Sequence, residues 1–110
     1  MIDGPPLQIV ASREFTAWLS ALRNRQAVRA IARRLDRLRG ANFGDHKQVG
    51  AKVGELRVDF GPGYRIYYTR LGNLVVVLLC GGDKSSQARD IPLAQEMAQR
   101  VEEIIHASRH

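Results

Sequence analysis

Three cationic side chains are the residues of this sequence best suited to chemistry on an anion. Arg57 and Arg65 lie in two stretches that alternate apolar and polar residues, and Lys84 follows two glycines after the most apolar run of the chain. The "GPG" at 61–63 is a turn signal that joins the two stretches into a hairpin. Converging cations can bind a phosphate without a metal ion. The spacing therefore predicts Arg57, Arg65 and Lys84 as a phosphate-binding, catalytic set.

The hairpin register is predicted from its apolar pairs. A three-residue turn centred on Pro62 pairs residues whose numbers sum to 124, which places Val58 opposite Ile66. The same register pairs Asp59 with Arg65 across the strands and makes Arg57 a diagonal neighbour of Arg65. The two glycines at 81–82 are expected to turn the chain sharply and to carry Lys84 to the rim of this face.

A second basic surface is predicted on a helix over residues 25–39. Its apolar side is formed by Val28, Ile31, Leu35 and Leu38, and its opposite side by Arg25, Arg29, Arg33 and Arg37. Like charges four residues apart are mildly destabilising in a helix. The stripe is interpreted either as an RNA-binding surface or as a solvated helix face.

The remaining pattern predicts an α+β domain that spans residues 1–110. A strand at 7–10 precedes a helix that Ser12 caps and that runs to about Leu22. After the second helix, three strands follow, the last being the apolar run at 74–80, and Asp90 caps a final helix with Pro92 in its first turn. The predicted order is strand-helix-helix-strand-strand-strand-helix, with a small antiparallel sheet and all helices on one face.

Composition indicates an anionic partner. The net charge is +6, with fourteen arginines against three lysines, and arginine suits phosphate and carboxylate groups. The single cysteine, Cys80, cannot form an internal disulfide, and no secretory signal precedes the first strand, so a cytoplasmic location is expected. No cysteine or acid stands at metal-ligand spacing from the histidines, so no metal is expected.

Several short motifs resemble one toxin family. "FTAWLSAL", "IARRLDRL", "ELR", "GPGYRIYY" and "LLCGGDKS" together resemble the HigB-like "addiction module killer" branch of the RelE/ParE toxin superfamily, over about residues 8–105. The resemblance implies a RelE-like fold and a bacterial type II toxin, neutralised by a cognate antitoxin, usually a HigA-like helix-turn-helix protein. Many relatives cleave mRNA on the ribosome without a metal or other cofactor, through attack of the ribose 2′-oxygen on the adjacent phosphate.

The resemblance also implies roles for single residues. Arg65 matches the family's phosphate-stabilising arginine, Arg57 matches another basic position, and Lys84 stands where RelE-type members carry an arginine. Lys47 and Lys52 lie in the basic segment before the hairpin and are candidates for RNA binding. The aromatic residue that stacks on the substrate base has no counterpart, since Asp90 falls near its place. The acid or base is left open among Glu55, Asp45 and His46.

Two alternatives to RNA cleavage are also compatible with the sequence. ParE-type members of the same superfamily inhibit DNA gyrase without cleaving RNA, and fold alone does not separate these activities. A toxin that has lost catalysis and only binds its antitoxin would also fit the missing aromatic residue.

Overall fold

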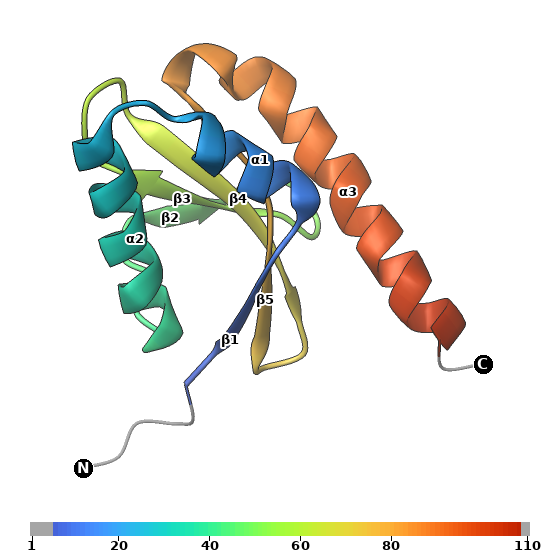
Figure 1. Cartoon of the computed structure of the whole chain (residues 1–110). Coiled ribbons are helices and arrows are strands. Elements are labelled where there is room, and N and C mark those ends of the chain that lie inside the picture. Colours follow the sequence, from blue (N-terminus) through green and yellow to red (C-terminus); the bar gives the residue numbers. More distant parts are fainter. Residues whose placement is uncertain (1–5, 109–110) are drawn as a thin grey trace.

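The computed structural model describes residues 6–108, and the side chains of residues 6–103 (Figure 1). The predicted α+β class is confirmed: three helices accompany a five-stranded sheet. The elements follow in the order β1 (Gln8–Ala11), α1 (Arg13–Ala21), α2 (Arg25–Arg39), β2 (His46–Gln48), β3 (Gly54–Val58), β4 (Tyr64–Leu71), β5 (Val75–Asp83), the 3₁₀ turn η1 (Lys84–Ser86) and α3 (Gln87–Ser108).

The first two helices begin where the sequence provides capping side chains. The Ser12 hydroxyl accepts a hydrogen bond of 2.9 Å from the Phe15 N–H, as predicted. The Asn24 side chain accepts from the N–H groups of Gln26 and Ala27 at the start of α2. These bonds satisfy N–H groups that have no partner inside the helix, so both helix starts are encoded locally.

The sheet is mixed, and the prediction of a wholly antiparallel sheet is wrong. Its strand order is β1-β5-β4-β3-β2, with β1 parallel to β5 and the other pairs antiparallel. Parallel pairing needs a long connection, and two helices and three strands separate β1 from β5 along the chain. The edge strand β2 was not predicted, because its three residues are all polar and exposed.

Helices cover both faces of the sheet, so the prediction that they share one face is also wrong. Helices α1 and α2 pack on one face (the α1/α2 face), over Leu56, Ile66 and Leu78 among others. Helix α3 packs on the opposite face (the α3 face), over Tyr67 and Leu79 among others (Figure 1). Strand β5 is apolar on both sides, and such a strand needs cover on both. The expected open floor is therefore largely occupied by α3.

The β3–β4 register differs from the prediction by two residues. Val58 pairs with Tyr64 and Leu56 with Ile66, so the paired numbers sum to 122. The connection is longer than predicted, and it contains Gly61 and Gly63 at φ of 56° and 79°. A shift of two residues keeps every side chain on its face, so the apolar pattern fits both registers equally well. Arg57 consequently lies directly opposite Arg65, and the predicted Asp59–Arg65 pair does not form.

The prediction of a sharp turn at the two glycines at 81–82 is wrong. Both glycines lie inside β5. A Cβ atom on Gly81 would lie 2.3 Å from the Trp18 ring, and one on Gly82 would lie 1.9 Å from the Asp90 carboxylate. Both glycines therefore allow close approach of a helix to the strand, one on each face. The sharp change of direction comes later, at η1.

Helix α3 begins at Gln87, four residues earlier than a helix capped by Asp90 would. The Asp83 carboxylate caps η1 by accepting from the N–H groups of Ser85 and Ser86. Asp90 is not a cap: it lies buried in the first turn of α3, where it accepts a hydrogen bond from the Ser86 hydroxyl. Among the described residues, no helix is both long and apolar enough to cross a membrane.

Candidate functional site

Arg57 and Arg65 form the centre of the candidate site. They are directly opposite each other in the β3–β4 ladder, and Arg65 is in turn paired with Gly82 of β5. Both side chains lie on the α3 face, because they alternate with the core residues of the α1/α2 face. Like charges directly opposite each other destabilise a strand pair. A negatively charged group is therefore needed between them, and the next β3 residue on the same face supplies it.

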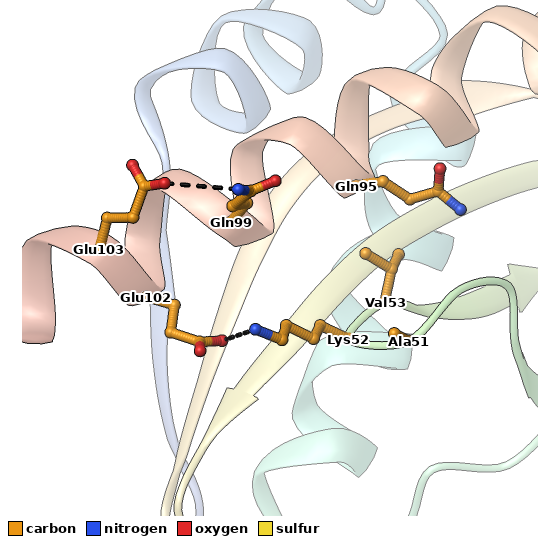
Figure 2. Close-up of a pocket in the computed structure, with 7 residues that line it drawn as sticks. All are labelled: Ala51, Lys52, Val53, Gln95, Gln99, Glu102 and Glu103. Atoms are coloured by element: carbon orange, nitrogen blue, oxygen red, sulfur yellow. Dashed lines mark hydrogen bonds and ion pairs between the residues drawn. The ribbon is translucent and has the colours of Figure 1, made fainter.

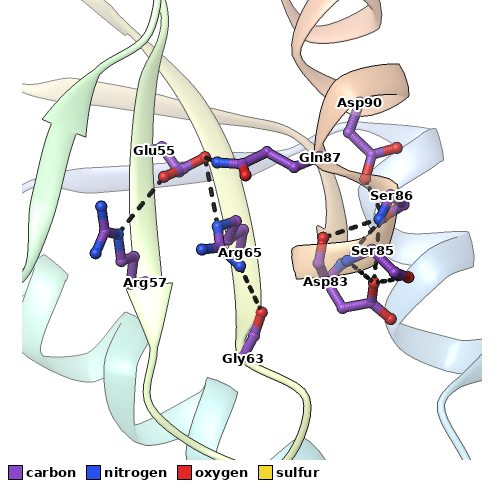
Figure 3. Close-up of polar contacts among 9 residues, drawn as sticks. All are labelled: Glu55, Arg57, Gly63, Arg65, Asp83, Ser85, Ser86, Gln87 and Asp90. Atoms are coloured by element: carbon purple, nitrogen blue, oxygen red, sulfur yellow. Dashed lines mark hydrogen bonds and ion pairs between the residues drawn. The ribbon is translucent and has the colours of Figure 1, made fainter.

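That group is Glu55, whose side chain is fully buried. One carboxylate oxygen, Oε1, lies 3.7 Å from Arg57 Nε, and the other, Oε2, lies 3.7 Å from Arg65 Nε. The Gln87 amide, from the first residue of α3, donates a hydrogen bond of 2.8 Å to Oε2 (Figure 3). We call Glu55, Arg57, Arg65 and Gln87 the Glu55 cluster. One carboxylate thus orients two guanidinium groups and ties them to α3.

The two arginines differ in access to solvent. The Arg57 side chain is 43% exposed, whereas that of Arg65 is only 11% exposed. Arg65 also donates from Nη1 to the Gly63 carbonyl at 3.0 Å. A guanidinium carries five N–H donors, so both arginines keep donors beyond these contacts. An external anion would meet Arg57 first, with Arg65 behind it.

Within the part of the chain that the structure describes, three buried polar atoms at this point have no hydrogen-bond partner: Glu55 Oε1, Arg65 Nε and the Tyr67 hydroxyl oxygen. Tyr67 is the direct cross-strand partner of Glu55. Burial raises the pKa of Tyr67, and the negative charge of Glu55 raises it further. Tyr67 is therefore a neutral phenol at physiological pH, with a proton that it can donate toward the cluster.

Lys84 lies on the turn that follows β5, two residues after Gly82, the partner of Arg65. It is the first residue of η1 and is exposed, and within residues 6–103 its ammonium group forms no ion pair. It follows Asp83, the cross-strand partner of Tyr64; hydrogen bonding from Ser85 lowers the pKa of Asp83. The structure thus pairs Arg57 with Arg65 and places Lys84 on a neighbouring turn, and the convergence of all three cations stays a prediction.

The acid/base candidates are placed apart from one another. Glu55 is buried beneath the arginines and does not reach solvent. His46 is paired with Leu56, which directs it to the α1/α2 face, and its ring lies 5.4 Å from that of Phe43. Asp45 contributes its main-chain carbonyl, which accepts from the Arg57 N–H at 3.0 Å. Glu55 is therefore buried and His46 lies on the other face, whereas Asp45 is exposed and adjoins Arg57 through this main-chain bond, so Asp45 stays an acid or base candidate.

The two lysines before the hairpin have different surroundings. Lys47 is exposed on β2 directly opposite Glu55, and so lies on the same face as the cluster. Lys52 forms an ion pair with Glu102 of α3 (Figure 2). That pair bridges a groove between the loop 51–53 and α3, lined also by Gln95, Gln99 and Glu103. Lys47 can extend the basic surface of the cluster, whereas Lys52 is neutralised.

The predicted arginine stripe of α2 is confirmed to be solvent-exposed. Its members are exposed, and the helix packs on the α1/α2 face. The stripe, Arg25, Arg29, Arg33 and Arg37, is thereby separated from the Glu55 cluster by the thickness of the sheet. The structure does not bring the two basic surfaces together.

Arg34, a buried arginine on the core side of α2, is not among the residues predicted from the sequence. Its guanidinium donates to three main-chain carbonyls, those of Phe43, Asp45 and Arg57. Burial lowers the pKa of Arg34, and the positive charge of Arg37 lowers it further. Arg34 thereby anchors the loop before β2 and the strand that carries Arg57. Four of the seven residues in "RRLDRLR" are arginine, and Arg34 stands next to Arg33 of the stripe, so residue type alone does not mark it as buried.

Comparison with known proteins gives one relative and no family name. An uncharacterized protein of Haemophilus influenzae is 45% identical over 95 residues, which cover 86% of this chain and 96% of that protein. No family model matches the sequence. The chain belongs to the same family as this Haemophilus protein.

Proposed function

We propose that this member of the family shared with the Haemophilus influenzae protein is a toxin of a type II toxin-antitoxin system, with a RelE-like fold of the HigB-like branch. Its activity would be metal-independent, ribosome-dependent cleavage of mRNA in the cytoplasm. Its partners would be mRNA, the ribosome and a cognate antitoxin of the HigA-like helix-turn-helix type. The observation that carries the proposal is the pairing of Arg57 and Arg65 directly across two strands, above one buried carboxylate.

The proposed reaction breaks one phosphodiester bond without water. The ribose 2′-oxygen attacks the adjacent phosphorus, the bond from phosphorus to the 5′-oxygen breaks, and a 2′,3′-cyclic phosphate and a free 5′-hydroxyl result. The 2′ proton leaves with a base, and the 5′-oxygen gains a proton. The charge that develops on the phosphorane oxygens is stabilised by fixed cationic donors.

The Glu55 cluster suits this charge stabilisation. Arg57, the more exposed arginine, would contact the phosphate. The positive charge of Arg65, the less exposed arginine, would stabilise the same phosphate at longer range. Fixed donors lose little entropy when a ligand binds, because their orientation is set beforehand. Glu55 fixes both guanidinium groups and is too buried to take the 2′ proton itself. It is therefore a positioning residue in this proposal, and the base is left unassigned.

Mapping of transcript 5′ ends after induction tests the proposal. Wild-type chain should create new ends at codon-linked positions in translated messages, and Arg57→Ala and Arg65→Ala should reduce them by about 100-fold, as loss of a charge-stabilising donor does. Arg13→Ala, which removes one exposed positive charge from α1, serves as the matched control and should cut like wild type. Each variant is also checked for cooperative unfolding, so that loss of fold is recognised.

Two outcomes would replace the proposal. A DNA-damage response without new transcript ends would favour the gyrase-inhibiting alternative. Antitoxin binding with neither effect would favour a toxin that has lost catalysis, a reading that the low exposure of Arg65 supports.

A further inference from the structure

A second cavity lies where β3 begins, beside the part of β4 that continues past it. The β3–β4 ladder stops at the Gly54–Tyr68 pair, while β4 runs on to Leu71. The notch so formed holds a cavity of about 430 Å³, within the range of small-ligand sites, about 300–1,000 Å³. Its walls include Phe43, His46, Gln48, Arg70, Lys52 and Glu102. No residue of the Glu55 cluster lines it.

Planar groups gather around Phe43 at one wall of this cavity, with the His46 and Tyr68 rings tilted by 51° and 44° against the Phe43 ring. The Arg70 guanidinium carbon lies 5.1 Å from the centre of the Phe43 ring, and the His46 ring lies 5.4 Å from the same ring. Tyr68 supports Phe43 from the core at 5.6 Å. Arg70 and His46 are exposed, so their outer faces are free to receive another planar group. Nucleobases stack on aromatic rings and on arginine planes, each base contributing a substantial share of affinity.

The rim of the cavity carries groups that recognise the rest of a nucleotide. Gln48 offers an amide, and Arg70 and Lys52 are cations against the one carboxylate of Glu102. The local charge is therefore positive, which suits a phosphate. Gly54 stands three residues before Arg57 in β3, about 10 Å away at the rise of a strand. His46 and Arg70 lie on the α1/α2 face, so an RNA strand that reaches both the cavity and the Glu55 cluster must pass around the sheet edge formed by β2.

We infer that this cavity binds a single unstacked base of an RNA strand, with His46 and Arg70 as the stacking surfaces. The inference extends the proposed function, because it assigns part of the RNA substrate to a site outside the cluster. It also gives a physical substitute for the stacking aromatic that the sequence lacks near Asp90. The assignment places the base next to β2 and the end of β4, and away from α3's first turn.

Binding of an uncleavable RNA tests the inference without any need for catalysis. A short 2′-O-methyl oligonucleotide is compared with its abasic counterpart, which has the same phosphates and no bases, by fluorescence anisotropy. The wild-type chain should bind the base-bearing strand about 5- to 150-fold more tightly, the range expected for one stacked base. His46→Ala and Arg70→Ala should remove most of that preference, and both residues are exposed, so the fold should persist. Arg13→Ala removes the same charge from α1, outside the cavity, and should keep the preference.

Three results would overturn the inference. Equal affinity for the base-bearing and abasic strands would exclude a base site. If Arg70→Ala and Arg13→Ala lowered the preference for the base-bearing strand equally, the preference would depend only on the net charge of the chain. Competition by adenosine or uridine monophosphate at the concentration of the oligonucleotide would reassign the cavity to free nucleotides. If the base preference holds while no transcript is cut in cells, the proposed nuclease function fails and the base site stands.

Discussion

Glu55 should be the side chain on which the stability of the candidate site depends most. Removing one partner of a buried ion pair leaves an uncompensated charge and costs about 3–5 kcal/mol. Glu55→Ala would leave Arg65, only 11% exposed, beside Arg57 with no carboxylate between them. We expect a loss of about 3–5 kcal/mol in the free energy of unfolding, out of a total of about 5–15 kcal/mol for a domain.

Graded variants separate the charge of Glu55 from its packing. Glu55→Gln keeps an acceptor for the Gln87 amide and removes only the charge, so its cost should be smaller, about 1.5–3 kcal/mol. The double variant Glu55→Met/Arg65→Met removes both charges and should recover most of the stability that Glu55→Ala loses. Asp36→Asn is the control, since its carboxylate pairs with Arg39 at 2.6 Å but is 72% exposed. An exposed pair contributes about 0–1 kcal/mol.

Urea unfolding followed by Trp18 fluorescence measures these differences. Trp18 lies 5.6 Å from Phe15 and 6.1 Å from Tyr64 between ring centres, so its emission reports the α1/α2 face and not the mutated site. The midpoint should shift while the slope with denaturant stays constant, as for a change in stability alone. A cost below about 1 kcal/mol for Glu55→Ala, or a double variant no better than Glu55→Ala, would refute the assignment of Glu55 as a buried counter-ion.

Three further changes test other parts of the structure. Gly82→Ala should destabilise the fold by about 1–3 kcal/mol or more, because its Cβ would lie 1.9 Å from the Asp90 carboxylate. Gly72→Ala, at a position with φ of 64° and open space around it, should cost about 1 kcal/mol. Thermal unfolding of the two variants compares these costs. Arg34→Met should cost about 3 kcal/mol, because three carbonyls lose a charged donor, and hydrogen exchange should quicken at β2. Burial raises the pKa of Cys80 from 9.0 to about 12, so the native thiol should resist a disulfide reagent at pH 8 until the chain unfolds. Its contribution to stability should be complete below pH 9 and be lost as the pH rises toward 12.

The helices of this fold could be predicted well from local signals. The Ser12 cap and the bounds 25–39 of the second helix were both confirmed, because capping and a period of 3.6 residues act within a few positions of the chain. The start of α3 could not be predicted in the same way. Asp83 and Asp90 are both suitable caps by residue type, and only the path of β5 decides between them.

The candidate site could be predicted only in part. Arg57 and Arg65 were expected to share a face, and they do, because a register error of two residues preserves the face of every side chain. The same error hid the direct Arg57–Arg65 opposition and the role of Glu55. A glutamate that alternates with core residues suggests a solvent-facing position, and nothing local reveals that α3 covers that face. Gln87, which holds Glu55, is 32 residues away in sequence.

The separation of the two basic surfaces has a consequence for how RNA would be handled. The arginine stripe of α2 and the Glu55 cluster lie on opposite faces of one sheet, so a single phosphate group cannot contact both. Under the proposed function, the stripe would therefore bind a body other than the scissile RNA, such as ribosomal RNA. Replacing Arg29 and Arg33 should then weaken ribosome binding with a strong dependence on salt, while the affinity for a short single strand, set by Arg57, Lys47 and the cavity beside β2, should stay the same. Equal weakening of both would mean that the stripe acts only through the net charge of the chain.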